Sequence, residues 1–244
     1  MLEPLWLRGY RDVLTVTLSE SSKDSLEDYG LARVVIVPVG FRSAGEPPDV
    51  PRETRPTIAF VGRLSANKRP DEAVQAFALL RETMPTAVLW VIGTGPMEDE
   101  LRMSAPEGVQ FLGRISESEK IERIARAHVL IMTSVREGWG LVVTEAAAVG
   151  TPVIAYDVAG LRDSVQASNG VLSAPDPKDL SSVLQEFLST WVRDGLPDIA
   201  PGGVIPWSEV AQRILAVATN GDSSLRCHED SMDTGFAPRP SKST

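Results

Sequence analysis

The sequence predicts an α/β protein with a doubly wound parallel sheet, and two observations support this prediction. From residue 57 onward, short runs rich in apolar and β-branched residues alternate with stretches of helical periodicity. The short runs are apolar throughout, which is typical of parallel strands that helices cover on both faces. We therefore expect a Rossmann-like domain in which helices connect successive strands.

Each element of this domain can be placed on the chain. The first strand is TIAFVG at 57–62, and the helix that follows at 69–84 starts with Pro70 and Asp71, which suit a first helical turn. Further strands are predicted at 87–93, 109–113, 129–134 and 152–156. Further helices are predicted near 97–103 and at 117–127, 141–149 and 177–189.

The rest of the chain divides into three segments around this domain. Residues 1–42 hold a strand–helix–strand fragment that is too short to form a domain, and 43–56 is a polar, proline-rich linker. The Rossmann-like domain then occupies 57–218 and includes a final helix at 207–218. Residues 219–244 have few apolar side chains to bury, so we expect a disordered tail.

Composition narrows the class of function. The 244-residue chain has 33 acidic and 24 basic side chains and a formal charge of −9, which argues against general nucleic-acid binding. Cys227 is the single cysteine, so neither an intramolecular disulfide nor a cysteine-based zinc cluster is expected. This usage fits the cytoplasm, and the sequence lacks an apolar run of the ~20 residues that span a bilayer. The sequence is also compatible with a peripheral contact to a membrane surface.

Ligands of open parallel sheets bind beyond the carboxyl ends of the strands, so the loops that follow the strands are the candidate binding sites. GRLSANKRP places Arg63 and Lys68 before a helix, which indicates either a diphosphate site or a solvated basic turn. GTGP, with Gly93 and Gly95, lacks the third glycine of a dinucleotide fingerprint and favours a tight turn. Gly113 in FLGRIS would let the backbone approach a flat ligand such as a base.

The stretch REGWGLVVTEAAAVG contains two carboxylates in different settings. Glu137 lies in a glycine-rich loop whose amides could meet an anion or a sugar, and Glu145 lies about one turn into the next helix. A carboxylate accepts two hydrogen bonds, which suits the vicinal diol of a sugar or ribose. Alternatively, Glu137 is a surface loop residue and Glu145 belongs to an exposed helical stripe. The alanines at 146–148 favour a closely packed helix instead.

Together, GRLSANKRPDEAVQAF, VIGTGP, FLGRI, REGWGLVVTEAAAVGTPVIAYDVAGLRDSV and NGVL resemble the retaining nucleotide-sugar glycosyltransferases of glycosyltransferase family 4 (group 1 glycosyltransferases). The resemblance covers about residues 12–218. It implies the GT-B fold, in which two Rossmann-like domains face each other, and it places this chain in the carboxyl-terminal, donor-binding half. Residues 1–42 then correspond to a remnant of the acceptor-side domain and the crossover.

The resemblance also implies roles for matching residues. Arg63 and Lys68 would grip the diphosphate, Glu137 would hold hydroxyls of the transferred sugar, and Glu145 would bind the ribose diol. The donor would meet the loop formed by Gly138, Trp139, Gly140 and Leu141, and Ile115 would lie at the base. Gly62, Gly93, Gly95 and Arg114 belong to the same matching segments and count as donor-binding.

The implied activity is transfer of a sugar from a nucleoside-diphosphate sugar to a glycan or lipid-linked acceptor, with retention of configuration. The sequence contains no D-x-D motif, so no metal site and no cofactor are expected. Most of the acceptor half is missing, and neither His128 nor His228 is placed to replace a histidine there. A partner chain could supply that half, in the cytoplasm or at the inner face of the membrane. Two alternatives are a nucleotide-sugar-binding module that is inactive alone and a nucleotide-sugar epimerase.

Overall fold

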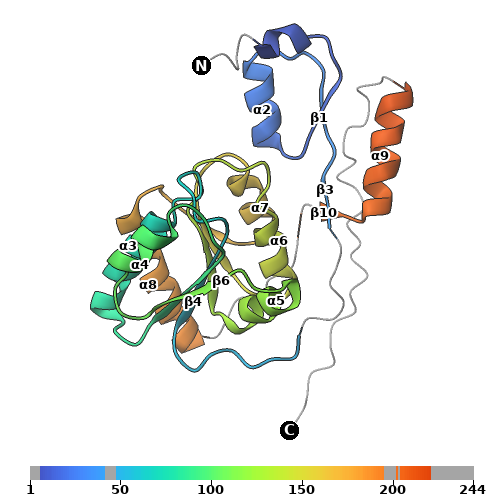
Figure 1. The fold of residues 1–244 in the computed structure, drawn as a ribbon. Coiled ribbons are helices and arrows are strands. Elements are labelled where there is room, and N and C mark those ends of the chain that lie inside the picture. Colours follow the sequence, from blue (N-terminus) through green and yellow to red (C-terminus); the bar gives the residue numbers. More distant parts are fainter. Residues whose placement is uncertain (1–5, 42–47, 195–201, 203, 221–244) are drawn as a thin grey trace.

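A six-stranded parallel sheet forms the centre of the molecule in the computed structural model, which describes residues 6–41, 48–194, 202 and 204–220. The strand order is β6-β5-β4-β7-β8-β9 (Figure 1). Every neighbouring pair is parallel, as the uniformly apolar runs predicted. The strands are β4 (Thr57–Val61), β5 (Val88–Ile92), β6 (Val109–Gly113), β7 (Val129–Met132), β8 (Val153–Tyr156) and β9 (Val171–Ser173).

Helices cover both faces of this sheet. One face packs against α3 (Pro70–Thr83), α4 (Glu98–Ser104) and α8 (Pro177–Asp194). The other packs against α5 (Glu117–Arg126), α6 (Leu141–Ala148) and α7 (Leu161–Ala167) (Figure 1). Each face buries its own apolar cluster, with Phe77 and Leu184 in the first and Ile124 and Val143 in the second. The predicted doubly wound architecture is therefore confirmed.

The sequence prediction missed part of the carboxyl-terminal half of the sheet. Helix α7 and strand β9 were not predicted, and α8 extends to Asp194 instead of ending at residue 189. Strand β9 has three residues and its first, Val171, is exposed, so it lacks the apolar run that identified the other strands. The short α7 has seven residues, too few for a clear helical period.

The amino-terminal residues form a small unit beside the sheet domain, together with the last helix (Figure 1). It contains a 3-10 turn at Arg8–Tyr10, β1 (Thr15–Thr17), α2 (Glu20–Asp28) and β2 (Val34–Ile36), with β1 and β2 parallel. Strand β3 (Val39–Gly40) pairs with β10 (Val204–Ile205), and α9 (Trp207–Asn220) packs against β3. Residue 42, residues 43–47 of the predicted linker and residues 221–244 of the predicted tail lie outside the described residues.

Residues 48–56 have neither helix nor strand, yet they are fastened to the sheet domain. The Arg52 guanidinium donates to Thr151 Oγ1 at 3.0 Å and to the carbonyl of Gly150 at 2.5 Å. Glu53 forms an ion pair with Arg126 at 2.5 Å. These partners precede β7 and β8, so the segment is held at the amino-end edge of the sheet. None of the helices in the described part of the chain is long and apolar enough to cross a bilayer.

Candidate functional site

Four loops meet at the carboxyl edge of the sheet. They follow β4, β5, β6 and β7, which are parallel neighbours, so all four leave the sheet on the same side. Backbone hydrogen bonds tie them to each other, from Leu64 to Thr94 (3.0 Å), from Gly93 to Gly113 (2.8 Å) and from Val135 to Asn67 (3.0 Å). The loops at 63–68, 93–96, 113–116 and 136–141 therefore share one edge, as the sequence predicted.

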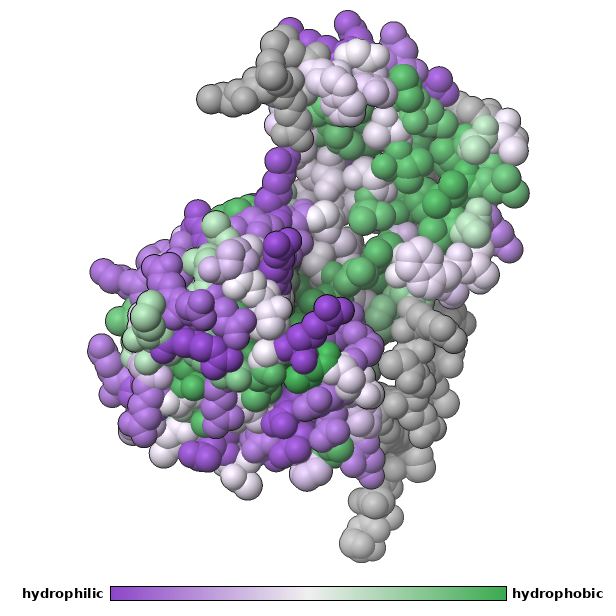
Figure 2. Space-filling view, viewed as in Figure 1, coloured by the Kyte–Doolittle hydropathy of each residue, from purple (hydrophilic) through white to green (hydrophobic). Residues whose placement is uncertain are grey.

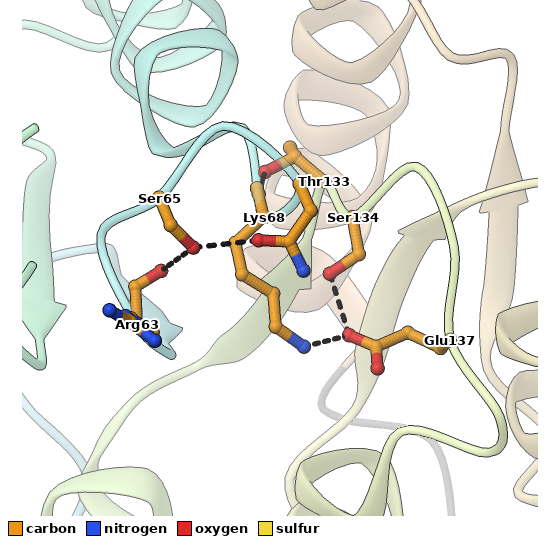
Figure 3. A network of polar contacts seen from close by, with 7 residues as sticks. Arg63, Ser65, Lys68, Thr133, Ser134 and Glu137 are labelled. Carbon is orange, nitrogen blue, oxygen red and sulfur yellow. Dashed lines mark hydrogen bonds and ion pairs between the residues drawn. The ribbon is translucent and has the colours of Figure 1, made fainter. Parts of the chain in front are cut away.

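An ion pair joins two of these loops. Lys68 Nζ lies against Glu137 Oε1, and the same oxygen accepts a hydrogen bond of 2.8 Å from Ser134 Oγ (Figure 3). The Lys68 and Glu137 side chains are 24% and 14% exposed, so the pair is largely shielded from water. Glu137 is therefore not a solvated loop residue. Its carboxylate and the Lys68 ammonium hold each other in place at the edge where a ligand would bind.

The backbone around Lys68 is held in an uncommon conformation. Arg69 has a φ of +46°, a left-handed value that is rare for a side chain other than glycine, and it precedes Pro70 at the start of α3. The buried Thr133 Oγ1 lies 2.9 Å from the Lys68 carbonyl and 2.8 Å from the Arg69 carbonyl. Thr133 thus anchors the loop to the end of β7 and fixes where Lys68 can reach.

Arg63 lies at the start of the same loop and is exposed. Its carbonyl accepts a hydrogen bond from the Ser65 amide at 2.9 Å, and the Ser65 carbonyl accepts one from the Lys68 amide at 2.9 Å. No described carboxylate forms an ion pair with the Arg63 guanidinium. A short hydrogen-bonded turn therefore connects one paired cation, Lys68, with one that is available to an anion.

The glycine-rich loop between β7 and α6 is folded closely onto the start of α7. A Cβ atom on Gly160, which has a φ of +81°, would lie 1.9 Å from the Glu137 carbonyl oxygen, so only glycine fits there. The Trp139 indole is buried and donates to Thr144 Oγ1 at 3.0 Å. The tryptophan therefore anchors the loop on α6, and the loop presents backbone to the edge. Gly138, Gly140 and Leu141 complete the turn into α6.

Glu145 lies in the second turn of α6 and is held by a residue from α5. Lys120 Nζ is 2.8 Å from Glu145 Oε2, and the two side chains are 16% and 19% exposed. Burial raises the pKa of Glu145, and the ion pair with Lys120 opposes that rise. The neighbouring Ala146 and Ala147 are buried, so the helix is packed as expected and Glu145 is not part of an exposed stripe.

The remaining predicted residues have mixed settings. A Cβ atom on Gly93 would lie 1.9 Å from the Gly62 carbonyl, so this glycine is required by the packing of two loops. A Cβ atom on Gly95 would lie 2.3 Å from the Leu64 carbonyl oxygen, so a side chain is excluded there as well. Arg114 is exposed after β6, and Ile115 is half-buried against the apolar cluster on that face. These residues surround the edge without joining the network of Lys68 and Glu137.

The amino-terminal unit reaches the glycine-rich loop through α2. Ser21 Oγ and the Ser21 amide (3.1 Å) both donate to Asp163 Oδ2, and Ser21 Oγ accepts from the Gly160 amide at 2.8 Å. Ser19 Oγ donates to the Gly138 carbonyl at 3.3 Å. The loop that carries Glu137 is thereby held from two sides, by α7 and by the start of α2.

Sequence reasoning missed several residues of this edge, namely Ser19, Ser21, Lys120, Thr133, Ser134 and Asp163. Thr133 and Ser134 had a visible signal, since they are the polar residues that end an apolar strand. Lys120 and Asp163 had none, because their partners are 25 and 142 residues away in the chain. Among the described residues, no group of three or more His, Cys, Asp or Glu side chains is arranged to hold a metal ion.

Comparison with known families identifies the class of protein. Residues 46–194 match the family model of the glycosyl transferases group 1, and the chain belongs to this family. The resemblance seen in the motifs is thus confirmed at the level of the group 1 glycosyltransferases.

Individual relatives agree with this assignment. The chain is 31% identical over 195 residues to a glycogen synthase of Mycobacterium tuberculosis, which covers 75% of this chain and 47% of the relative. It is 35% identical over 178 residues to the D-inositol 3-phosphate glycosyltransferase of Jonesia denitrificans, covering 66% and 42%. The chain therefore spans about half the length of these curated relatives.

Solved structures share the fold. HepE of Anabaena, in complex with UDP and glucose, matches with a TM-score of 0.68 at 17% identity and covers 89% of this chain and 67% of its own. TarM of S. aureus matches with a TM-score of 0.67 at 16% identity and covers 84% and 41%. The Rossmann-like sheet described above is thus the fold of known glycosyltransferase structures.

Proposed function

We propose that this chain is the donor-binding half of a glycosyltransferase that moves a sugar from a nucleoside-diphosphate sugar to a glycan or lipid-linked acceptor, with retention of configuration. The observation that carries this proposal is the Lys68–Glu137 pair, which combines a cation and a carboxylate at the carboxyl edge of the sheet. A nucleotide sugar needs both groups, since its diphosphate is anionic and its sugar is rich in hydroxyls.

The reacting step breaks the bond between the sugar and the diphosphate, and the nucleoside diphosphate leaves with the bonding electron pair. Arg63 and Lys68 would stabilise the charge that develops on the leaving diphosphate, together with the amides at the start of α3. Arg63 is exposed and would reach the anion without breaking an ion pair to a described residue. Lys68 would exchange part of its contact with Glu137 for the phosphate.

The two glutamates would serve opposite ends of the donor. Glu137, in the loop formed with Gly138 and Gly140, would accept hydrogen bonds from the transferred sugar. Glu145 would accept them from the ribose diol. The HepE structure contains UDP and glucose on the same fold, which supports a donor with these two parts. Titration with a panel of nucleotide sugars identifies the base and the sugar of the donor.

We further propose that donor binding is independent of a divalent metal. The cations Arg63 and Lys68 supply positive charge beside the diphosphate, and the sequence contains no D-x-D motif. We expect titration of the chain with UDP, GDP or ADP to give the same affinity in excess EDTA as in millimolar magnesium. A loss of affinity of tenfold or more in EDTA would contradict this part of the proposal.

The acceptor half would pack against the amino-terminal unit and α9. Figure 2 shows apolar side chains gathered over this part of the molecule. Its exposed apolar residues are Trp6, Tyr10, Val13, Val16, Leu18, Trp207, Ile214 and Leu215. A surface with this many exposed apolar side chains is typical of an interaction site. We propose that this surface contacts an acceptor-side domain.

An assay that separates binding from turnover tests the proposed function. The chain is titrated with UDP, GDP and ADP and with their glucose, mannose and N-acetylglucosamine conjugates, and release of nucleoside diphosphate is followed with and without candidate acceptors. Binding of one nucleotide series supports the donor site. Binding without turnover under every condition favours the alternative of a binding module. A chain that binds none of these ligands would contradict the proposal.

A further inference from the structure

Lys120 is a largely buried cation that connects α5 with α6 beside the candidate site. It belongs to α5, and its ammonium contacts Glu145 of α6 at 2.8 Å and Glu117 of its own helix at 2.6 Å. The Glu117 side chain is 75% exposed, so water screens that contact. In the contact with Glu145 both side chains are largely buried, and this contact therefore fixes the positions of the two charged groups.

The two oxygens of Glu145 are not equivalent. Oε2 is buried, and its contact is the ion pair with Lys120 at 2.8 Å, without a hydrogen bond of regular geometry. Among the described residues, no side chain or amide donates to Oε1. Carboxylate oxygens that have no protein partner are those that a ligand hydroxyl can use. Lys120 therefore determines which oxygen points inward and which is presented.

Lys120 and Glu145 each help to keep the other group charged. Burial lowers the pKa of Lys120, but the contacts with Glu117 and Glu145 outweigh burial and raise it, so the ammonium stays charged at neutral pH. Burial raises the pKa of Glu145, and Lys120 counteracts this effect. Without Lys120, the carboxyl group would be more readily protonated and would lose acceptor capacity.

Helix α5 links the Lys120–Glu145 pair to the loop that would meet the nucleotide base of the proposed donor. Helix α5 begins directly after the loop that carries Arg114 and Ile115, and the Ser116 hydroxyl caps it by accepting from the Glu119 amide at 3.2 Å. Lys120 lies one turn further along. The helix that frames the base-side loop thus also supplies the partner of Glu145.

We propose that Lys120 is a positioning residue that orients Glu145 to recognise a ribose diol, and that it thereby sets the preference of the site for ribonucleotides over deoxyribonucleotides. This inference rests on the proposed function, because it assumes that Glu145 meets the ribose. Lys120 acts through Glu145 and contacts no reacting atom.

The test compares one nucleoside diphosphate with its 2′,3′-dideoxy analogue, using whichever of UDP, GDP or ADP the chain binds. Wild type should bind the ribonucleotide more tightly than the analogue by about tenfold or more. Lys120→Met should lose most of this preference while its affinity for the dideoxy analogue stays within about twofold of wild type. Lys120→Arg, which keeps the charge, should retain most of the preference. Glu117→Gln serves as the control and should leave the preference unchanged.

A purely structural role would change melting temperature without changing the ratio of the two affinities. The ratio measured for Lys120→Met in a Glu145→Gln background adds a second readout, since loss of Lys120 should then have no further effect. If Lys120→Met does not fold, Lys120→Gln is measured in its place. A preference retained in Lys120→Met, or absent in wild type that binds the nucleotide, overturns the inference while donor binding stands. Wild type that binds no nucleoside diphosphate overturns the proposed function itself.

Discussion

Lys68 and Glu137 form an ion pair between loops that follow different strands of the sheet, β4 and β7. Ser134 Oγ donates a hydrogen bond to Glu137, and the ion pair is largely shielded from water. A cation that must later grip a phosphate is thus held in position by the carboxylate that would meet the sugar. Removing the Lys68 side chain leaves Glu137 without its cation, whereas an amide at position 137 keeps an oxygen that can still accept from Lys68 and Ser134.

The two cations of the first loop should therefore respond differently to substitution. Arg63 is exposed and Arg63→Ala should weaken nucleoside-diphosphate binding by roughly 1.5–3 kcal/mol with an unchanged melting temperature. Lys68→Ala should weaken binding by a similar amount and also lower the melting temperature, because Glu137 loses its cation. Calorimetry and thermal melts measure both quantities. The control is Arg102→Ala on α4, and unchanged affinity in a folded Arg63/Lys68 double variant would contradict the assignment.

Asp163→Asn should release the amino-terminal unit from the glycine-rich loop. Asp163 accepts two hydrogen bonds from Ser21, and an amide in its place would retain one acceptor without the charge. We expect faster hydrogen exchange in α2 and in residues 137–140, measured by mass spectrometry, while β4 and β5 keep their protection. Asp157→Asn, which removes an exposed ion pair with Arg162, is the control. Equal exchange in Asp163→Asn and wild type would mean that this contact does not hold the two parts together.

His128 should make the fold sensitive to moderate acid. Burial, assisted by the charge of Arg52, lowers the pKa of His128 to about 4, from an ordinary value of 6.5. The folded state therefore keeps the ring neutral, and the stabilisation relative to the unfolded chain is complete above pH 6.5 and is lost as the pH falls toward 4. Each pKa unit corresponds to about 1.4 kcal/mol.

Urea unfolding at pH 7.0 and 5.0 measures this effect. Wild type should lose stability between the two values, and His128→Gln should lose less, since its side chain does not titrate. The glutamine variant will be less stable at pH 7, because the His128 ring accepts from the Thr57 amide at 2.9 Å and packs on Trp191. The comparison is therefore between the changes in unfolding free energy from pH 7.0 to 5.0. An identical change in wild type and His128→Gln would rule out His128 as the titrating group.

The sequence predicted most of the sheet because its central strands are buried on both faces, and such strands have an unmistakable apolar composition. Strand β9 was missed for the opposite reason, since it has three residues and a partly exposed edge. The site was predicted loop by loop, because polar residues and glycines that end an apolar strand are visible locally. Pairings across the fold were not visible. Neither the Lys68–Glu137 pair nor the Lys120–Glu145 pair follows from spacing, because each depends on which strands are neighbours in the sheet.

The central claim is that the two glutamates hold opposite ends of one nucleotide sugar, and a paired titration tests it most directly. Wild type, Glu137→Gln and Glu145→Gln are each titrated with the preferred nucleoside diphosphate and with its sugar conjugate. Glu145→Gln should weaken both ligands, and Glu137→Gln should spare the nucleotide and weaken only the conjugate, with losses on the order of 1–3 kcal/mol. Equal losses for both ligands in both variants would contradict the two-ended assignment.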